Sequence, residues 1–391
     1  MEYDINDLSI PFEERHAACR WLRDNDPVHW DEKNGFWILT RHEDVRALAK
    51  DADRFSNAIH GPWHMMSTTR GSIECMDGRA HLRTRNLVSR AFTPRIVSYL
   101  SEHAHRYIDE AIDRVLPLGA CDFVEALAVP VPMRLIAEMI GIADGDIDQF
   151  RRWSDAIFEA TSSDPQRSQA VAEASAALAS YLGEAIGKRR AEPRDDILSS
   201  LIAARDAGAL GEDAGLAHDE LIQFLMLLIM AGNETTRNAI SGGMLALLQH
   251  PEQLERLRQD LALMPTAVEE ILRWTSVVRA LCRTVTRDTE LCGKQLLEGQ
   301  RVLMIYTSAN RDERVFDAPH EFRVDRTPNE HLTFGFGAHY CLGANLAKME
   351  IAVVMREVVS RLPGLRLAPR AEIRRDDGAL AETITSLPVV F

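Results

Sequence analysis

The chain has 391 residues, of which 46% are hydrophobic and 27% charged, a composition typical of a globular protein whose core is large enough to enclose a cofactor. Its 45 Lys and Arg residues against 59 Asp and Glu residues give a formal net charge of −14. Such an acidic surface is repelled by phosphate backbones, so the composition argues against nucleic acid as a partner.

Targeting signals and membrane spans are not evident. Residues 1–7 have neither the basic flank nor the apolar stretch of a signal peptide. The longest strongly apolar run, 224–231, is far shorter than a bilayer span. Six cysteines are scattered without a CxxC pair, a pattern typical of reduced thiols. We therefore expect a cytoplasmic protein with no membrane partner.

The first 60 residues predict a small β-rich region. An amphipathic helix over Phe12–Asn25 precedes two strand-like stretches, 28–30 and 35–40, separated by a turn-prone Asn-Gly pair. A second helix is expected over 42–49. The stretch 55–75 has no periodicity and predicts a loop, and loops of this length are usually functional or disordered.

Helical patterns dominate the rest of the chain. A succession of helices is expected over 96–190, with a break at Pro130. Residues 218–250 then predict one apolar helix of about nine turns. Its middle, Ala231-Gly-Asn-Glu-Thr-Thr236, is polar, and a carboxylate buried there needs partners. We expect this patch to interrupt the helix for a functional reason.

A single cysteine, Cys341, lies in a glycine-rich loop directly before the helix-forming run 344–359. The N-terminus of a helix offers unpaired N–H groups and the positive end of a dipole, and both favour a thiolate over a thiol. Glycines allow the backbone to approach whatever the sulfur binds. A buried structural cysteine beside a turn is the ordinary alternative. The spacing described next favours a ligand.

The spacing Phe334-Gly335-x-Gly337-x-His339-x-Cys341-x-Gly343 resembles the haem-binding loop of cytochromes P450. The resemblance implies that Cys341 is the axial thiolate ligand of the iron of noncovalently bound haem b, a ligand that favours O–O cleavage. It also implies that His339 reaches a haem propionate and that Phe334 covers the sulfur. Gly335 and Gly343 belong to the same cofactor-binding loop.

The same resemblance implies the fold and its organisation. We expect a mainly α protein with a minor β region, the cytochrome P450 fold, as a single domain over 1–391. Its small β-rich part would cover about 1–60 and its helical haem-binding part about 75–391.

Further P450 motifs follow in the family's order. His81 and Arg85 are four residues apart on one predicted helix face, and with Arg283 they match the residues that bind haem propionates. Glu270 and Arg273 match the ExxR pair, which Arg326 would join. ExxR alone carries little information, but its place before the cysteine loop gives it weight.

The polar patch of the long helix resembles the P450 motif at which dioxygen is handled. Small side chains at Ala231 and Gly232 would leave room for O2. By the same resemblance Glu234 and Thr235 are the catalytic acid and alcohol that deliver protons. The surrounding sequence is similar to that of bacterial P450s acting on sterols and methyl-branched lipids.

These matches imply a monooxygenase that inserts one atom of O2 into a C–H bond of a hydrophobic substrate, such as a sterol, terpenoid or lipid. Trp63, Met65 and Met66 of the 55–75 loop are candidate substrate contacts, and packing onto the core is an equal alternative for them. At Val277 many bacterial P450s have proline. The candidate substrate contacts are Trp63, Met65, Met66, Leu227, Met230, Val277, Val278 and Ile384.

The resemblance also implies partners. Electrons would come from a ferredoxin and its reductase, because no such domain is recognisable in the chain. Arg83, Arg90 and Lys348 are candidates for a basic docking face, and we expect a monomer. Two alternatives stay open. One is a peroxide-dependent P450, a group that usually lacks the acid–alcohol pair, and the other is a haem-containing carrier or sensor without turnover.

Overall fold

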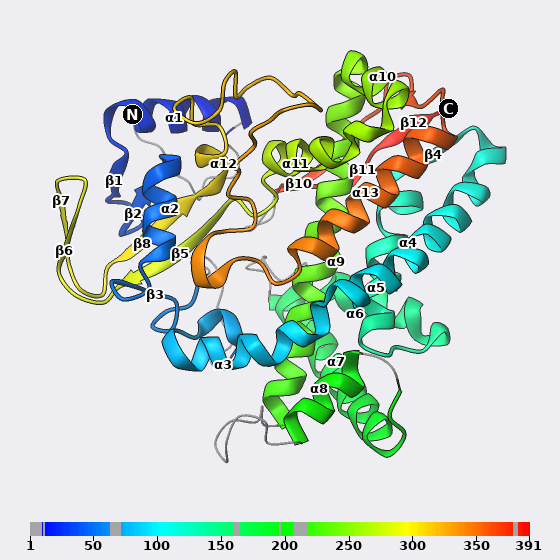
Figure 1. The fold of residues 1–391 in the computed structure, drawn as a ribbon, viewed down its shortest axis with the longest axis horizontal. Helices are drawn as coiled ribbons and strands as arrows, with labels where there is room; N and C mark the ends of the chain where they lie inside the picture. The colour runs from blue at the N-terminus through cyan, green and yellow to red at the C-terminus, as the bar shows by residue number, and fades with distance from the viewer. Residues whose placement is uncertain are drawn as a thin grey trace.

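The computed structural model describes residues 10, 12–62, 72–158, 165–194, 197–206, 218–377 and 382–391. Most helices lie together on one side of the molecule, and a five-stranded sheet lies on the other side with α1 and α2 (Figure 1). The expected mainly α fold with a minor β region is confirmed.

The element bounds are as follows. The α-helices are α1 (Phe12–Asn25), α2 (His42–Lys50), α3 (Gly78–Val88), α4 (Pro94–Val115), α5 (Pro130–Met139), α6 (Ile147–Phe158), α7 (Pro165–Ala191), α8 (Ile197–Asp206), α9 (His218–Gln249), α10 (Pro251–Gln259), α11 (Met264–Thr275), α12 (Tyr306–Ala309) and α13 (Ala344–Arg361). The strands are β1 (Val28–Asp31), β2 (Phe36–Leu39), β3 (Phe55–Ser56), β4 (Ala120–Asp122), β5 (Ala280–Val285), β6 (Thr289–Leu291), β7 (Lys294–Leu296), β8 (Arg301–Ile305), β9 (Arg366–Leu367), β10 (Arg374–Asp377), β11 (Glu382–Ser386) and β12 (Pro388–Val390).

The main sheet pairs strands from the first 60 residues with strands from residues 280–305. Its strands follow the order β1-β2-β8-β5-β3, so Phe36 of β2 pairs with Arg301 of β8 and Phe55 of β3 pairs with Val285 of β5. β1 and β2 form an antiparallel hairpin, β2 runs parallel to β8, and β5 is antiparallel to β8. The N-terminal β-rich part therefore shares one sheet with residues 280–305.

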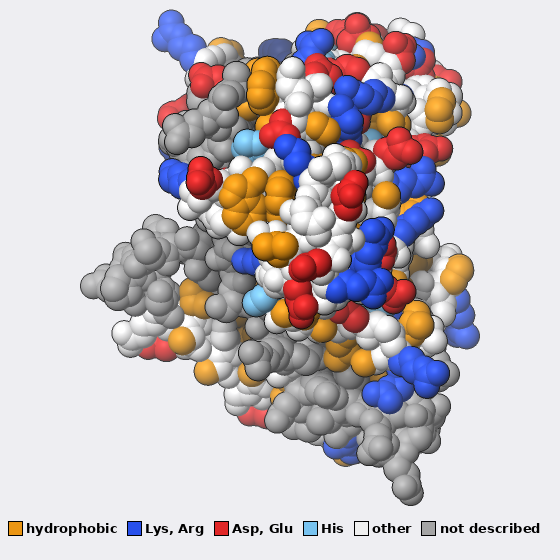
Figure 2. All heavy atoms as spheres, turned by 90° about the vertical axis from the view of Figure 1, so that its left-hand side faces the viewer, with side chains coloured by type: hydrophobic (Ala, Val, Ile, Leu, Met, Phe, Trp, Pro, Cys, Tyr) orange, Lys and Arg blue, Asp and Glu red, His pale blue; other side chains and the backbone are white. Residues whose placement is uncertain are grey.

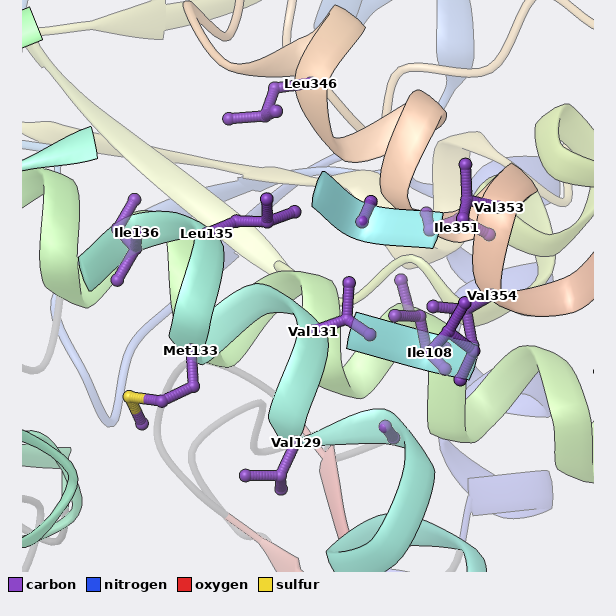
Figure 3. Packing of buried hydrophobic residues seen from close by; sticks show 14 of the residues in the cluster. Ile108, Val129, Val131, Met133, Leu135, Ile136, Leu346, Ile351, Val353 and Val354 are labelled. Atoms are coloured by element: carbon purple, nitrogen blue, oxygen red, sulfur yellow. The ribbon is translucent and has the colours of Figure 1, made fainter. Parts of the chain in front are cut away.

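Helix α9 runs through the helical part of the molecule, with α13 beside it (Figure 1). An apolar helix without a wide polar face is buried on all sides, and Leu225, Ile240 and Leu247 have no exposed surface. Around it, side chains of α4, α5 and α13 interdigitate (Figure 3), among them Ile108, Val131 and Val354. This packing fixes the start of α13 relative to α9.

The structure corrects two expectations. Helix α9 is continuous through Ala231–Thr236, so the polar patch does not interrupt it. The break expected at Pro130 is a change of helix type, from a π-helical turn at Val124–Ala128 to α5, which begins at Pro130 itself. A proline at the first position of a helix needs no N–H partner, so the chain direction continues.

The face that carries the main sheet has acidic and basic side chains intermixed with apolar ones (Figure 2). Surface ion pairs such as Arg314–Asp24 and Arg46–Glu330 contribute to this mixture. None of the helices in the described ranges combines the length and apolar character that a bilayer crossing requires.

Candidate active site

The loop before α13 is held in shape by backbone hydrogen bonds and by glycines. The Cys341 amide donates to the Phe334 carbonyl at 2.9 Å, which closes the loop. Gly335 and Gly337 both have positive φ, +70° and +75°. A Cβ on Gly337 would lie 2.7 Å from the carbonyl oxygen of Ala49, so the loop packs against the end of α2 at a distance only glycine permits.

Cys341 is deeply placed and still has accessible surface. Burial raises the pKa of its thiol, although the backbone amide of Gly343 and the charge of Arg85 act in the opposite direction. In the protein without a metal, desolvation therefore opposes the thiolate that the helix start favours through the Gly343 amide. A bound cation would reverse this balance, since a coordinating thiol is deprotonated by the metal.

The candidate propionate ligands come together beside this cysteine. The rings of His81 and His339 lie 4.0 Å apart between centroids, and His339 Nε2 is 3.8 Å from Asp77 Oδ1. Arg85 donates to the Tyr340 carbonyl at 2.6 Å. Arg283, which is 4% exposed on β5, lowers the pKa of His339 by its charge. Three separate elements thus supply one cationic cluster.

The electrostatics of this cluster favour an anion. Burial and the neighbouring His339 lower the pKa of His81 to about 4. Burial also lowers the pKa of His339 and of Arg283. For Asp77 burial alone would raise the pKa, but hydrogen bonds from His339, Ser56 and two backbone amides lower it well below its ordinary value. One carboxylate therefore faces two arginines and two histidines.

Asp77 and Tyr306 were not singled out from the sequence. Asp77 accepts hydrogen bonds from Ser56 Oγ and from the amides of Asn57 and Ala58. It therefore connects the end of β3 to the start of α3. The Tyr306 hydroxyl is buried and has no hydrogen-bond partner within the described part of the chain. A Cβ on Gly335 would lie 3.7 Å from it. No local pattern marks either residue, because both gain their meaning from distant segments.

These observations fit haem. In the described ranges no three His, Cys, Asp or Glu side chains gather as metal ligands, so an iron held by Cys341 needs its other ligands from a cofactor. A porphyrin supplies them, and its propionates would be held by Arg85 and Arg283, with His81 and His339 as further hydrogen-bonding groups. The buried Tyr306 hydroxyl is a further polar group on this side of the loop.

The oxygen-handling motif lies in the middle of α9. Thr235 Oγ1 donates to the Ala231 carbonyl at 2.5 Å, which is the back-bond that a hydroxyl makes within a helix. Ala231 is exposed, whereas its neighbours on α9 from Met230 to Asn238 are buried or half-buried, so the helix has a free face at this turn. A Cβ on Gly232 would come 2.9 Å from Ile136 Cδ1. A side chain at position 232 would therefore require Ile136 of α5 to move.

Glu234 is buried and does have partners. Arg237, one turn later, forms an ion pair with its carboxylate, and Asn238 Nδ2 donates to it at 3.2 Å. Burial raises the pKa of Glu234, while Arg237 and Asn238 oppose the shift. Sequence reasoning missed both partners, although their i+3 and i+4 spacing from Glu234 was a usable signal.

The ExxR residues and Arg326 meet in the core. Glu270 accepts from Arg273 Nε at 2.7 Å and from Arg326 Nε at 3.0 Å, and its other oxygen accepts from the Arg323 amide. Arg273 also donates to the carbonyls of Asn310 and of Pro319, in the segment before the cysteine loop. The predicted juxtaposition of Glu270, Arg273 and Arg326 is present.

The candidate substrate contacts are spread over several elements. Leu227 and Met230 are half-buried on α9, whereas Val277 and Ile384 are buried in the main core and Val278 packs against the cluster beside the main sheet. Three candidate substrate contacts, Trp63, Met65 and Met66, lie outside the described residues.

Of the candidate docking residues, Arg83 is exposed on α3. Lys348 forms an ion pair with Glu269 at 2.7 Å, and its ammonium lies 5.5 Å from the Phe334 ring centroid. The partly buried Phe334 packs against the main core. The side chain of Arg90 is outside the described part of the structure.

Comparison with known proteins agrees with this geometry. A family model described as cytochrome P450 matches residues 146–363. The chain is 38% identical over 376 residues to a steroid C26-monooxygenase of Mycolicibacterium smegmatis, covering 96% of this chain and 92% of that one.

Two solved structures are also similar. Bacillus megaterium CYP109E1 in complex with testosterone has a TM-score of 0.87 and 32% identity, covering 96% of this chain and 98% of that chain. P450BioI in complex with hexadec-9Z-enoic acid ligated acyl carrier protein has a TM-score of 0.87 and 29% identity, covering 97% and 98%.

The relatives match the chain over nearly its whole length, and the chain contains the haem-loop cysteine, the buried ExxR pair and the acid–alcohol motif on α9. Haem is the cofactor of this family. The chain therefore belongs to the cytochrome P450 family and is a haem-dependent monooxygenase.

Proposed function

We propose that this P450 hydroxylates a sterol or a related hydrophobic molecule, with electrons from a ferredoxin and its reductase. The observation that carries the reaction class is the gathering of Cys341, Arg85, His81 and His339 at the loop before α13, together with the acid–alcohol motif on α9, the helix that packs against α13. The relatives named steroid C26-monooxygenase and the similar testosterone complex support the substrate class.

Each part of the cluster has a role toward haem in this proposal. Cys341 would hold the iron, and His81, Arg85, Arg283 and His339 would bind the propionates. When bound, thiolate-ligated haem activates dioxygen for insertion into a C–H bond. Gly343 has open space around the position of a Cβ, which suits close approach of a flat ligand to the loop.

The residues of α9 would handle protons and exclude bulk water. Glu234 is a buried carboxyl whose pKa burial raises, so it can take up a proton and pass it on within the protein. Thr235 is the next residue along the chain and carries the hydroxyl that would receive this proton. In the structure that hydroxyl is bonded to the Ala231 carbonyl, so it must turn from its helical partner to act.

The substrate would lie on the open side of α9. Ala231 provides the exposed turn, and the half-buried Leu227 and Met230 provide apolar surface in the turn just before it. An apolar lining with few polar anchors suits a sterol, and a lipid chain is the next candidate because the similar P450BioI structure carries a fatty acyl group.

The redox partner would dock near the cysteine loop. Arg83 is exposed on α3, and Lys348 and Arg356 line a groove between α11 and α13 together with apolar residues such as Met264. Basic groups at the rim of an apolar contact favour an acidic partner such as a ferredoxin. The proposal includes a single-domain monomer in the cytoplasm, in keeping with six free cysteines.

The test separates this proposal from its alternatives. The holoenzyme is titrated with sterols, terpenoids and fatty acids, and the low- to high-spin shift of ferric haem identifies ligands. Cys341→Ser should remove the absorbance band of the reduced carbon monoxide complex that marks thiolate ligation. Thr235→Ala should uncouple NADH use from product. Spectral shifts without any product would mean a haem carrier, and turnover supported by peroxide but not by ferredoxin would mean a peroxide-dependent enzyme.

A further inference from the structure

A row of polar side chains is buried along one face of α9. Glu234, Arg237, Asn238 and Ser241 follow an i, i+3, i+4, i+7 spacing, which places them on one side of the helix. Glu234 and Asn238 are each 4% exposed and Ser241 is fully buried. Because buried polar groups cost free energy unless they are hydrogen-bonded, the partners of this row are informative.

Asn238 connects the row to the C-terminal hairpin. Its amide nitrogen donates to Glu234 Oε1 at 3.2 Å and to Thr383 Oγ1 of β11 at 3.1 Å. A primary amide has two N–H groups, and these two acceptors use both. The position of the Glu234 carboxylate therefore depends on a strand that is 145 residues further along the chain.

A charged partner binds the same carboxylate oxygen, Oε1, as Asn238 does. Arg237 pairs with Glu234 from the same helix, and Asp155 of α6 raises the pKa of Glu234 by its negative charge. Asp155 lies 3.5 Å from Arg151, which partly compensates that charge. Glu234 thus has one cationic neighbour and one neutral donor. Of these, the neutral donor Asn238 is oriented by Thr383.

Two polar atoms of this network have no partner within the described ranges, Asn238 Oδ1 and Arg237 Nε. Both are buried, and each lies two bonds from an atom that contacts Glu234. Buried polar groups of this kind are those that ordered water satisfies in proteins. The network is therefore suited to positioning a proton donor rather than only to filling space.

We propose that Asn238 and Thr383 are positioning residues that orient the Glu234 carboxyl toward Thr235, so that hairpin β10–β11 takes part in proton delivery. The inference rests on the proposed role of Glu234 as the proton donor. Neither residue touches the reacting atoms. Thr383 acts through Asn238, and Asn238 acts through the carboxylate.

The chain offers a matched set of variants. Thr383→Val removes the hydroxyl and keeps the shape, and Thr383→Ser restores a hydroxyl at the same place. Thr385→Val makes the same change two residues along the strand, at an exposed position outside the network. Glu234→Gln removes the carboxyl itself.

The holoenzyme variants are compared in NADH oxidation with a ferredoxin and its reductase, in H2O and in D2O, with testosterone as the added probe and peroxide release as the second readout. We expect Thr383→Val to slow the proton-dependent rate by up to about tenfold, the upper end of the effect of one neutral hydrogen bond, and to raise both peroxide release and the solvent isotope effect. Thr383→Ser and Thr385→Val should behave as the unmodified enzyme, and all variants should keep the haem spectrum.

The outcomes are distinguishable. If Glu234→Gln changes the isotope effect but Thr383→Val does not, the positioning role is overturned and the proposed function stands. If Glu234→Gln changes neither readout, the proposed proton donor is itself refuted. A Thr383→Val effect that Thr383→Ser fails to reverse would show that packing, and not the hydroxyl, is responsible, and this too would overturn the inference.

Discussion

Glu270 and Arg326 form a buried ion pair between α11 and the segment before the cysteine loop, with 3.0 Å between Oε2 and Nε. The same oxygen accepts from Arg273 at 2.7 Å. Glu270 and Arg273 have no exposed surface, so two guanidinium groups and one carboxylate are held away from water. Such a group is stable only while every member is present.

Glu270→Gln should therefore destabilise the protein by about 3–5 kcal/mol, because it leaves two buried arginines facing a neutral amide. The free energy of unfolding is measured in guanidinium chloride by circular dichroism. Arg256→Ala is the control, since the Arg256–Asp325 pair has a similar length of 2.7 Å but is partly exposed. It should cost less than about 1 kcal/mol, and equal losses in the two variants would contradict the argument from burial.

Two glycines should respond to alanine in opposite directions. Gly337→Ala should destabilise by at least about 1–2 kcal/mol, because φ is +75° and the new Cβ would meet the Ala49 carbonyl. Gly187→Ala lies on exposed α7, where no atom is within 4 Å of the new Cβ, and should stabilise by about 0.5–1 kcal/mol. Melting temperatures of the two variants test this, and a neutral Gly337→Ala would refute the close approach of the loop to α2.

Glu350 of α13 should make stability depend on pH. It is 3% exposed, its Oε2 has no partner in the described part of the chain, and burial raises its pKa well above the ordinary value. The folded state thus keeps a proton that the unfolded state loses. The stability that the protein gains from the protonated Glu350 is present in acid. It is lost as pH rises from about 4.5 through the raised pKa of Glu350.

Glu350→Gln removes this titration, so the variant should gain stability relative to the unmodified protein as pH rises from 5 to 8, and the gain should vanish near pH 4. Unfolding curves at a series of pH values measure it. Glu290→Gln on the exposed strand β6 controls for the loss of one negative charge. A stability difference that stays constant across this range would contradict the burial of a protonated Glu350.

Charge reversal of the proposed docking face should slow reduction. Arg83→Glu should lower the rate of electron transfer from the native ferredoxin and weaken its dependence on salt, because rim charges act mainly on association. Stopped-flow reduction measures the rate, and the haem spectrum should stay intact. Arg287→Glu, exposed in the hairpin after β5, should leave the rate unchanged. An unaltered rate in Arg83→Glu would reject this face as the docking site.

Local patterns predicted much of the fold and the centre of the site. The periodicity of 218–250 predicted one long helix, and α9 ends one residue earlier, at Gln249. The predicted helix over Phe12–Asn25 has the same bounds as α1. The glycine spacing around Cys341 predicted a tight loop before a helix. These features depend on the dihedral preferences and dipoles of neighbouring residues, so a short window of sequence contains them.

The electrostatic balance of the site could not be predicted in this way. The helix start suggested a thiolate at Cys341, whereas burial raises the pKa of the thiol. Asp77 and Tyr306 gave no signal, because their importance comes from His339 and Gly335 in a distant loop. Desolvation depends on all the atoms packed around a group, and a sequence window does not contain them.

The sequence by itself determined the long helices, the first strands, the place of Cys341 in a tight loop before a helix and the order of the P450 motifs. Only the tertiary structure decided which side chains meet, such as His81 with His339 and Asn238 with Thr383. The physical reason is that secondary structure and loop geometry follow from local propensities, whereas contacts between distant segments follow from how their buried faces pack.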